Sequence, residues 1–468
     1  MHLRHLAFAF LPLLAACGSS ASTAAGQAKL TADVAAAADA KTTADTGLPA
    51  GWPADAVKVQ APTAWNSGGD LAPYSVHLTW EHDPASHVSV SWATKAQDLK
   101  AYSPKVWFAP ESIGAADAAT LPFAVTLTAT GAGEIYQTNG STDFPPAVTW
   151  TTELAGLQPD TAYVFRTGTW SGFDAKTGTF TAPELSEVGH FRTAPLKGTR
   201  KPFAVVLAGD SRGGIDLITQ NAERLGAIDA AFWIFNGDFT NLGLQMEWDS
   251  WIAAMQPVMR HRVLMPVQGN HEIFADMFYA QFAMPVMSGL PTEYAEHAWS
   301  FNYANVHFIG LDSNADQNVQ DQVAWLDADL AAARQDPDVD WIIPMSHHPA
   351  YSACTNHGST PIMQQYWVPL FEKYNVELVF SGHDHNYERT KSVRGGKAVA
   401  DGQGPVYVVA GGFYSPPYTN GSDWWTATSS PGSKHNYVEL KVDGKKLSFT
   451  TYSGDGSEVL DQFSISKP

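Results

Sequence analysis

Cysteine and basic residues are the two kinds of side chain that this sequence has little of. Its 468 residues include two cysteines, Cys17 and Cys354, so a disulfide framework is excluded as the source of stability. The 28 Lys and Arg residues stand against 47 Asp and Glu, which gives a formal net charge of −19. This acidity argues against DNA, RNA or an anionic membrane surface as the main partner, because their phosphates would be repelled.

The N-terminus has the pattern of an export signal. An apolar run over residues 6–16 is too short for the roughly 20 residues of a membrane-spanning helix. The run stops at Leu-Ala-Ala-Cys-Gly-Ser, residues 14–19, which resembles a bacterial lipoprotein signal. The resemblance implies removal of residues 1–16, a diacylated Cys17, and contact with a bacterial membrane through this lipid anchor only. An ordinary secretory signal with a chance cysteine is the alternative, and both predict an exported protein.

Two segments of different character follow the signal. Residues 17–68 are predicted to be a tether, because much of this stretch is Ala, Ser and Thr with no face to bury. Residues 69–197 contain short strands with alternating apolar and polar side chains, separated by turn residues. The clearest of these strands are at residues 75–80, 87–92, 105–108 and 147–150. Residues 69–197 resemble a fibronectin type III-like β-sandwich.

Aromatic residues support the sandwich interpretation. Tyr163 follows a Leu-Gln-Pro-Asp-Thr-Ala entry to a late strand, where it would make a tyrosine-corner hydrogen bond. Trp80, Trp92 and Trp107 are expected in the core rather than at a sugar-binding surface, since aromatic residues dominate such cores. Residues 168–185 break the strand pattern and are predicted to be an extended loop.

Residues 198–468 change to an α/β pattern, so the chain is predicted to have a two-domain α+β/α/β architecture. Apolar runs of four to six residues, typical of buried strands, now alternate with helical periodicity. The predicted strands are residues 203–208, 231–235, 263–267, 307–311, 341–345 and 376–380. Residues 320–335 and 361–374 are predicted to be amphipathic helices.

Polar motifs closely follow five of these six strands. They are Gly209-Asp210-Ser-Arg212, Gly237-Asp238-Phe-Thr-Asn241, Gly269-Asn270-His271-Glu272, His347-His348-Pro349 and Gly382-His383-Asp384-His385. Ligands of open α/β sheets bind at the carboxyl ends of strands, so these loops should converge. Carboxylates and imidazoles together are metal ligands, and the ordered set therefore predicts a metal site.

The ordered motifs resemble the calcineurin-like metallophosphoesterases, and most closely their purple acid phosphatase branch. The resemblance implies a four-layer α/β/β/α domain with two metal ions, drawn from iron, zinc and manganese. Its first metal ion would be held by Asp210, Asp238 and His385. The second would be held by Asp238, Asn270, His347 and His383, with Asp238 bridging. His348 would then lie behind the ligands or serve packing.

Two positions depart from the purple branch. Asn241 stands where that branch has a tyrosine ligand, so the resemblance predicts a colourless protein. Asn241 could offer a carbonyl oxygen to the first metal ion or cap the following helix. Arg212 cannot ligate a metal ion, and it is predicted to clamp a phosphoryl oxygen, with a surface ion pair as the alternative.

The resemblance also implies the reaction. A metal-bound hydroxide would attack the phosphorus of a small phosphate monoester in line, without a serine or cysteine nucleophile. By resemblance, His271 would stabilise the transferred group or protonate the leaving oxygen, and His357 would contact substrate. Residues 413–425 would wall the pocket or pack the domains together, and Cys354 is expected to serve packing.

Two other functions remain open at this point. One is a phosphodiesterase on the same scaffold, since fold analogy cannot choose between monoesters and diesters. The other is a non-catalytic surface binding protein that uses the sandwich. The oligomeric state and the metal pair are left open.

Overall fold

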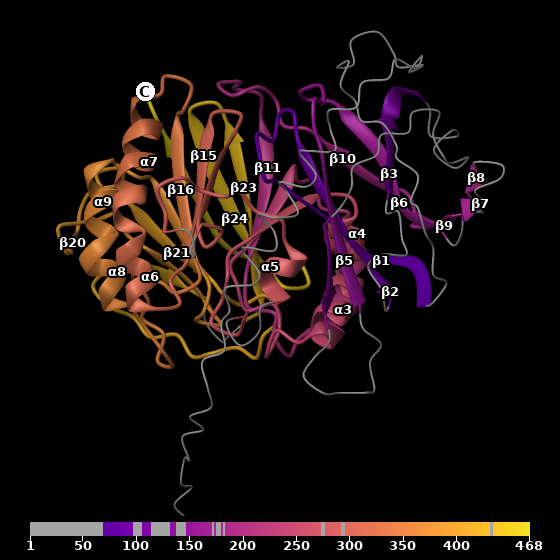
Figure 1. Ribbon diagram of the computed structural model, residues 1–468. Helices are drawn as coiled ribbons and strands as arrows, with labels where there is room; N and C mark the ends of the chain where they lie inside the picture. The colour runs from indigo at the N-terminus through magenta and orange to yellow at the C-terminus, as the bar shows by residue number, and fades with distance from the viewer. Residues whose placement is uncertain are drawn as a thin grey trace, which may run out of the picture. The chain divides into compact units, whose positions relative to one another are not determined.

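The structure is a computed structural model, and it describes residues 69–96, 105–113, 132–136, 147–170, 173–174, 179–180, 183–272, 277–291, 295–430 and 434–468. The predicted signal, Cys17 and the predicted tether lie outside the described residues. Figure 1 shows the arrangement of the helices and strands.

The N-terminal strands form two antiparallel sheets. One has the order β1-β2-β5-β4, and the other has the order β10-β6-β3 with β9 paired to β6. The strands of the first are β1 (Gly69–Thr79), β2 (Val88–Ala96), β4 (Ala132–Tyr136) and β5 (Ala147–Leu154). Those of the second are β3 (Lys105–Pro110), β6 (Ala162–Trp170), β9 (Pro183–Leu185) and β10 (Gly189–Arg192). A 3₁₀ turn, η2 (Glu111–Ile113), and a hairpin of β7 (Phe173–Asp174) and β8 (Thr179–Phe180) complete this part.

The aromatic residues of the sandwich lie where the sequence predicts. The hydroxyl of Tyr163 accepts a hydrogen bond from the backbone N–H of Gln158 at 2.9 Å, which confirms the tyrosine corner. Trp80, Trp92 and Trp107 are each at most 1% exposed, so they are core residues and cannot stack on a sugar. The prediction of a loop over residues 168–185 was wrong in part. Strand β6 continues to Trp170 and pairs there with β9, since an edge strand satisfies backbone groups that a loop would leave open.

The sandwich sheet continues into the next part of the chain. Strand β1 pairs in parallel with β13, so a single ten-stranded sheet runs β25-β24-β23-β11-β12-β13-β1-β2-β5-β4. The Trp80 ring packs against Phe232 and Phe301, each at 5.1 Å between centroids. Gln256 donates a hydrogen bond to the Val76 carbonyl at 2.9 Å. The two parts therefore share a sheet and a core.

The remaining strands of the ten-stranded sheet surround its parallel centre. They are β11 (Phe203–Ala208), β12 (Phe232–Phe235), β13 (Val263–Pro266), β23 (Asn436–Asp443), β24 (Lys446–Ser453) and β25 (Val459–Ser466). Four helices belong to the same half of the domain, namely α2 (Ile215–Gly226), α3 (Gln245–Ala254), α4 (Gln256–Met259) and α5 (Met277–Gln281). Most buried side chains of α2 and α3 join the core that also holds side chains of β11 and β12.

A second sheet has the order β14-β15-β16-β17-β21-β18-β22. Its strands are β14 (Trp299–Tyr303), β15 (Val306–Leu311), β16 (Trp341–Ser346), β17 (Leu378–Ser381), β18 (Tyr387–Thr390), β21 (Val406–Ala410) and β22 (Thr426–Ser429). The helices α6 (Asp316–Asp321), α7 (Val323–Gln335), α8 (Pro361–Tyr366) and α9 (Val368–Lys373) cover its outer face (Figure 1). A hairpin of β19 (Val393–Arg394) and β20 (Lys397–Ala398) lies apart from both sheets.

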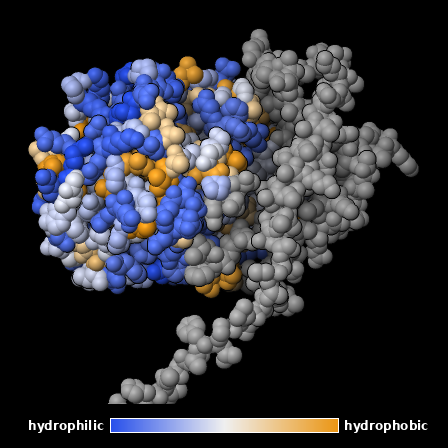
Figure 2. Space-filling view, turned by 60° about the vertical axis from the view of Figure 1, so that its left-hand side comes forward, coloured by the Kyte–Doolittle hydropathy of each residue, from blue (hydrophilic) through white to orange (hydrophobic). Residues whose placement is uncertain are grey.

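Neighbouring side chains of the buried strands point to opposite faces of a sheet, and so they pack into different layers of the domain. In β16, Ile342 packs into the cluster of the outer helices, while Trp341 and Ile343 pack into the core between the sheets. The same division separates Tyr407 from Val408 in β21. The result is the predicted four-layer α/β/β/α arrangement. Figure 2 shows that hydrophilic residues dominate the coloured part of the visible surface, with hydrophobic residues in a few patches, as expected for a surface in contact with water.

The predicted strands match closely, and the predicted helices are less continuous than expected. Strand β11 has the predicted bounds, and the other five shift by at most two residues at an end. Residues 320–335 divide between α6 and α7, and residues 361–374 divide between α8 and α9. Pro369 lies in the first turn of α9, where its missing N–H interrupts helical hydrogen bonding and accounts for the second break.

Candidate metal centre

Five strand ends bring the predicted residues together from two sheets. Asp210, Asp238 and Asn270 follow β11, β12 and β13, whereas His347 and His383 follow β16 and β17. Backbone hydrogen bonds join these loops in pairs. The N–H of Asp210 donates to the Gly237 carbonyl at 2.9 Å, and the N–H of Gly382 donates to the His347 carbonyl at 2.9 Å. Backbone hydrogen bonds therefore fix the relative positions of loops that are distant in sequence.

Three of the predicted ligands have strained backbone. Asp210, Asp238 and His383 have φ values of 64°, 55° and 68°, a left-handed region that is uncommon for residues other than glycine. The adjacent glycines are needed for space. A Cβ on Gly269 would lie 2.4 Å from Asp238 Oδ1, and one on Gly382 would lie 2.4 Å from Asp210 Oδ2. The glycines of the Gly269-Asn270 and Gly382-His383 pairs thus allow the close approach of the two carboxylates.

Asp210, Asp238 and His385 form the first group of potential ligands. Their ligand atoms lie within 4.8 Å of one another, and all three residues are buried. His385 Nδ1 must donate to the Pro416 carbonyl, 2.8 Å away, because a carbonyl only accepts. The neutral ring then has its lone pair on Nε2, 3.6 Å from Asp210 Oδ1. Among the described residues, this Nε2 has no hydrogen-bond partner, so it suits a metal ion.

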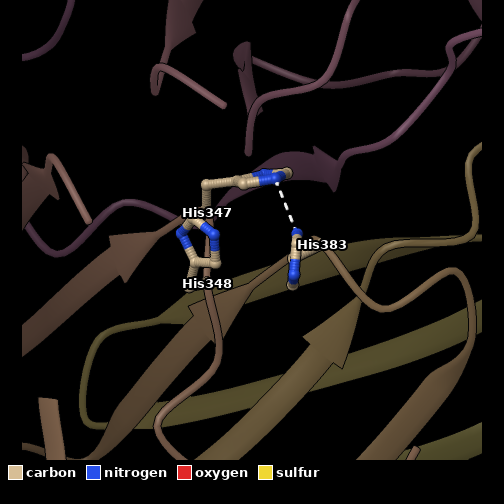
Figure 3. A group of neighbouring side chains, drawn as sticks. All are labelled: His347, His348 and His383. Atoms are coloured by element: carbon tan, nitrogen blue, oxygen red, sulfur yellow. Dashed lines mark hydrogen bonds between the residues drawn. The ribbon is translucent and has the colours of Figure 1, made fainter. Parts of the chain in front are cut away.

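A second group forms around His347 Nε2. His347 Nδ1 donates to the Asn236 carbonyl at 2.7 Å, which leaves Nε2 as the nitrogen that faces inward. This nitrogen lies 3.2 Å from Asp238 Oδ1, 3.0 Å from Asn270 Oδ1 and 3.2 Å from His383 Nδ1. Figure 3 shows the rings of His347 and His383 turned toward each other. Asp238 therefore contacts residues of both groups, as a bridging ligand would.

His348 lies closer to this second group than a packing residue would. Its ligand nitrogen is within 4.8 Å of those of His347 and His383, and its ring centroid is 4.2 Å from that of His383 (Figure 3). The Ser313 hydroxyl lies 2.9 Å from its Nδ1 and accepts its backbone N–H at 2.9 Å. His348 thus faces His383 with its ring fixed from behind by Ser313.

Burial and nearby charges shift the pKa values of the groups. Burial, together with the charge of Asp238, raises the pKa of Asp210 well above its ordinary value. Burial lowers the pKa of His385 to about 4 and also lowers that of His383, so both rings are neutral and able to ligate. Burial opposes ionisation of Asp238, but His347 outweighs it and lowers its pKa. Burial alone would lower the pKa of His347, yet Asp238 raises it to about 10.

The predicted substrate residues surround the two groups. Arg212 Nε lies 3.4 Å from Asp238 Oδ2, and His271 Nε2 lies 3.9 Å from the same oxygen. His357 is exposed, and its ring centroid lies 4.3 Å from that of His383. The predicted alternative of a surface ion pair for Arg212 is wrong, because its ionic partner is the buried Asp238.

Asn241 stands apart from the other candidates. Its side chain is exposed, and its backbone carbonyl accepts a hydrogen bond from His271 Nδ1 at 2.7 Å. The suggested role as a helix cap is wrong, since α3 begins at Gln245 and the residue before it is Leu244. Ligation by Asn241 stays a prediction. Cys354 is buried, and burial raises the pKa of its thiol to about 11, which agrees with the expected packing role.

Two further contributors were not assigned from the sequence. The fully buried Glu272 carboxylate accepts the N–H groups of Asp238, Gly269 and Thr240 at 2.8, 3.0 and 3.2 Å. Its place directly after Asn-His in the third motif was the available signal. The Tyr418 ring stacks on His385 at 4.0 Å and 10°. Its position in an irregular segment gave no comparable signal beyond the aromatic content of residues 413–425.

Family comparisons agree with this geometry. Residues 203–387 match the family model of calcineurin-like phosphoesterases, and residues 73–193 match that of the purple acid phosphatase N-terminal domain. Residues 203–387 therefore form a calcineurin-like phosphoesterase domain, and this family uses a dinuclear metal centre. The N-terminal family model and several of the relatives described next are those of purple acid phosphatases.

The individual relatives are distant. An uncharacterized Mycobacterium tuberculosis protein is 32% identical over 283 residues, which cover 52% of this chain and 50% of that protein. Purple acid phosphatase 18 of Arabidopsis thaliana is 27% identical, with 66% of this chain and 68% of the relative covered. A purple acid phosphatase from yellow lupin seeds has the same fold, with a TM-score of 0.70, 19% identity, and 85% and 74% of the two chains covered. The chain spans about half the length of the first curated relatives it matches.

Proposed function

We propose that the protein hydrolyses phosphate monoesters at a dinuclear metal centre. The observation that carries this proposal is the shared position of Asp238, which lies in the first ligand group and contacts His347 of the second. Monoesters are favoured over diesters because of the cationic and donor groups beside the centre. Arg212 and His271 both face Asp238 Oδ2, where they can bind the doubly charged phosphoryl group of a monoester.

The residues present fit two metal ions. His385 Nε2 is a buried lone pair without a partner among the described residues, and Asp210 and Asp238 supply hard carboxylate oxygens. Asp210, Asp238 and His385 would hold one ion, and Asp238, Asn270, His347 and His383 the other. Bound ions would supply Lewis-acid polarisation of the ester and a nucleophile from water at neutral pH.

The protein groups have separate roles in this reaction. Arg212 carries a fixed positive charge and binds a phosphoryl oxygen, which orients the ester. The Asn241 carbonyl accepts a hydrogen bond from the Nδ1–H of His271 and so fixes the orientation of this ring. The opposite nitrogen, Nε2, faces the centre and can donate a proton to the leaving oxygen when the ring is protonated. The exposed His357 contacts the substrate from the rim.

Turnover of p-nitrophenyl phosphate and bis-p-nitrophenyl phosphate by the metal-loaded protein tests the substrate class. We expect preference for the monoester, and preference for the diester would establish the phosphodiesterase alternative. Asp238→Asn should lower turnover at least about 100-fold, beyond the loss typical of residues behind the ligands. Asp316→Asn on the exposed surface of α6 is the matched control and should retain full turnover.

A non-catalytic role of the sandwich is the second alternative. The burial of Trp80, Trp92, Trp107 and Trp150 disfavours sugar binding, because these rings offer no exposed face. Fewer than two bound metal ions per chain together with no turnover of either ester would support this alternative.

We also propose that the protein is exported. Residues 69–197 and 198–468 would form its two domains. The lipoprotein-like signal supports export and a lipid on Cys17 as the membrane attachment. Among the described residues, no helix is long and apolar enough to cross a membrane. Labelling with radioactive palmitate should mark the full chain expressed in a bacterium, and Cys17→Ser should abolish both the label and the membrane fractionation. An unlabelled parent chain would refute the lipid anchor.

A further inference from the structure

Residues 413–418, which follow β21, cross two of the three loops that supply the first ligand group, those of Asp210 and His385. The N–H of Phe413 donates to the Gly209 carbonyl at 2.9 Å, and that of Ser415 donates to the Asp210 carbonyl at 3.1 Å. The Ser415 hydroxyl donates to the Arg212 carbonyl at 3.1 Å. This crossing segment is therefore fixed directly to the loop that carries Asp210 and Arg212.

The same segment is fixed to the loop of His385. The Pro416 carbonyl accepts from His385 Nδ1 at 2.8 Å, and the N–H of Tyr418 donates to the His385 carbonyl at 2.9 Å. The Tyr418 ring lies flat on the His385 ring, with 4.0 Å between centroids and 10° between planes. These contacts fix both the backbone and the ring of Tyr418 relative to the candidate metal ligand.

The hydroxyl of Tyr418 is then placed against Arg212. Arg212 Nη2 donates to this hydroxyl at 3.0 Å. On its other side, Arg212 Nε lies 3.4 Å from Asp238 Oδ2, a contact too poorly aligned for a hydrogen bond. Because Arg212 is 24% exposed, its guanidinium borders the open side of the centre. The Tyr418 hydroxyl is thus the hydrogen-bonding partner that sets the orientation of this guanidinium beside Asp238.

We propose that Tyr418 is a positioning residue for substrate, which holds Arg212 in the orientation that binds the phosphoryl group of the ester. The inference rests on the proposed function, since it assigns Arg212 to phosphate binding. A long arginine side chain loses considerable rotamer freedom when it is fixed, and a preset hydroxyl removes part of that loss from substrate binding. Tyr418 acts in this way through Arg212 and not by its own contact with the ester.

The test compares Tyr418→Phe with the parent protein, both loaded with metal. The substitution keeps the ring stacked on His385 and removes only the hydroxyl. We expect KM for p-nitrophenyl phosphate and the dissociation constant of inorganic phosphate, measured by calorimetry, to rise together by roughly five- to tenfold. The kcat value should change less than about twofold, because binding and orientation are weakened while the reacting groups remain.

Tyr414→Phe is the matched control. The Tyr414 hydroxyl accepts a hydrogen bond from Arg224 at 3.2 Å and donates to the Gly454 carbonyl at 2.7 Å. It thus has the same kind of arginine contact in the same segment, yet its arginine belongs to helix α2 and not to the metal loops. KM and phosphate affinity should be unchanged in this variant. Equal losses in Tyr414→Phe and Tyr418→Phe would mean that general loosening of the segment explains the effect, which would overturn the proposal.

A double variant separates positioning from direct contact. In an Arg212→Ala background, Tyr418→Phe should cause no further loss of phosphate affinity, because its effect passes through Arg212. Additive losses would show that Tyr418 binds the ester itself, and unchanged affinity in the single variant would show no role at all. Both results would overturn the proposal. Absence of turnover in the parent protein would instead contradict the proposed function, while the calorimetric comparison would still decide the role of Tyr418.

Discussion

Glu272 and Glu247 both accept hydrogen bonds from backbone N–H groups of the loop after β12. Substitution by glutamine should lower the free energy of unfolding more at Glu272 than at Glu247. Glu272 Oε2 accepts from Asp238 and Gly269 at 2.8 and 3.0 Å, and its Oε1 accepts from Thr240 at 3.2 Å. Glu247, at the start of α3, accepts from Asn241 and Leu242 at 3.1 and 2.9 Å. Glu272 is fully buried, whereas these contacts of Glu247 are exposed to solvent.

The expected magnitude follows from the number of acceptors. Glutamine has one side-chain oxygen, so in Glu272→Gln at least one buried N–H would face an NH₂ group and lose its acceptor. An unsatisfied buried donor costs about 1–3 kcal/mol, so the free energy of unfolding should fall by about that amount. Water can replace the lost acceptor in Glu247→Gln, whose loss should stay below about 1 kcal/mol.

Urea unfolding of both variants, followed by tryptophan fluorescence, measures the two losses. Glu272→Gln should also weaken metal binding, because Glu272 holds the backbone of Asp238 and the glycine before Asn270. Glu247→Gln should leave metal affinity unchanged. Equal stability losses in the two variants, or parental metal affinity in Glu272→Gln, would refute the reasoning that the buried carboxylate organises the ligand loops.

Three further predictions concern the metal ions and the sandwich. Elemental analysis of the purified protein should find about two metal ions per chain, and Asp238→Asn should leave at most about one, since it removes the shared carboxylate. The iron-loaded protein should be colourless and Asn241→Tyr should add a visible absorption band; a band in the parent would show that another phenolate reaches the iron. Tyr163→Phe should lower the free energy of unfolding by about 0.5–1.5 kcal/mol in urea titrations, and an unchanged midpoint would contradict a stabilising tyrosine corner.

The local signals in the sequence were sufficient to predict most of the side chains that the structure brings together in the two candidate ligand groups. Each predicted ligand follows an apolar run within a few residues, and the runs have lengths and compositions that identify buried strands. Parallel strands place their carboxyl ends at one edge, so Asp210 and Asp238 could be expected to meet without any knowledge of their contacts. The structure brings both together with His385, which comes from the other sheet.

Contacts between segments that lie far apart in the sequence could not be predicted in the same way. Strand β1 pairs with β13 through Leu78 and Val263, and nothing local in either segment specifies that partner. The contact between Tyr418 and Arg212 spans 206 positions and depends on the path of an irregular segment. The helical spacing of apolar residues likewise predicted a continuous helix across Trp367. This spacing indicates which face of a helix is buried, but it does not show where the backbone hydrogen bonds are interrupted.

The backbone of the candidate metal centre is strained, and the core that the sandwich shares with the ligand-bearing strands stabilises the fold against this strain. Asp210, Asp238 and His383 each hold a left-handed backbone that costs roughly 1–2 kcal/mol, so together they cost about 3–6 kcal/mol. This is a large part of the 5–15 kcal/mol by which domains are typically stable. Trp80 of the sandwich packs into the same core as Phe232, whose strand leads to Asp238. The sandwich thus contributes buried area that offsets strain in the ligand loops. Its removal should weaken the site even though none of its described residues belongs to the candidate ligand groups.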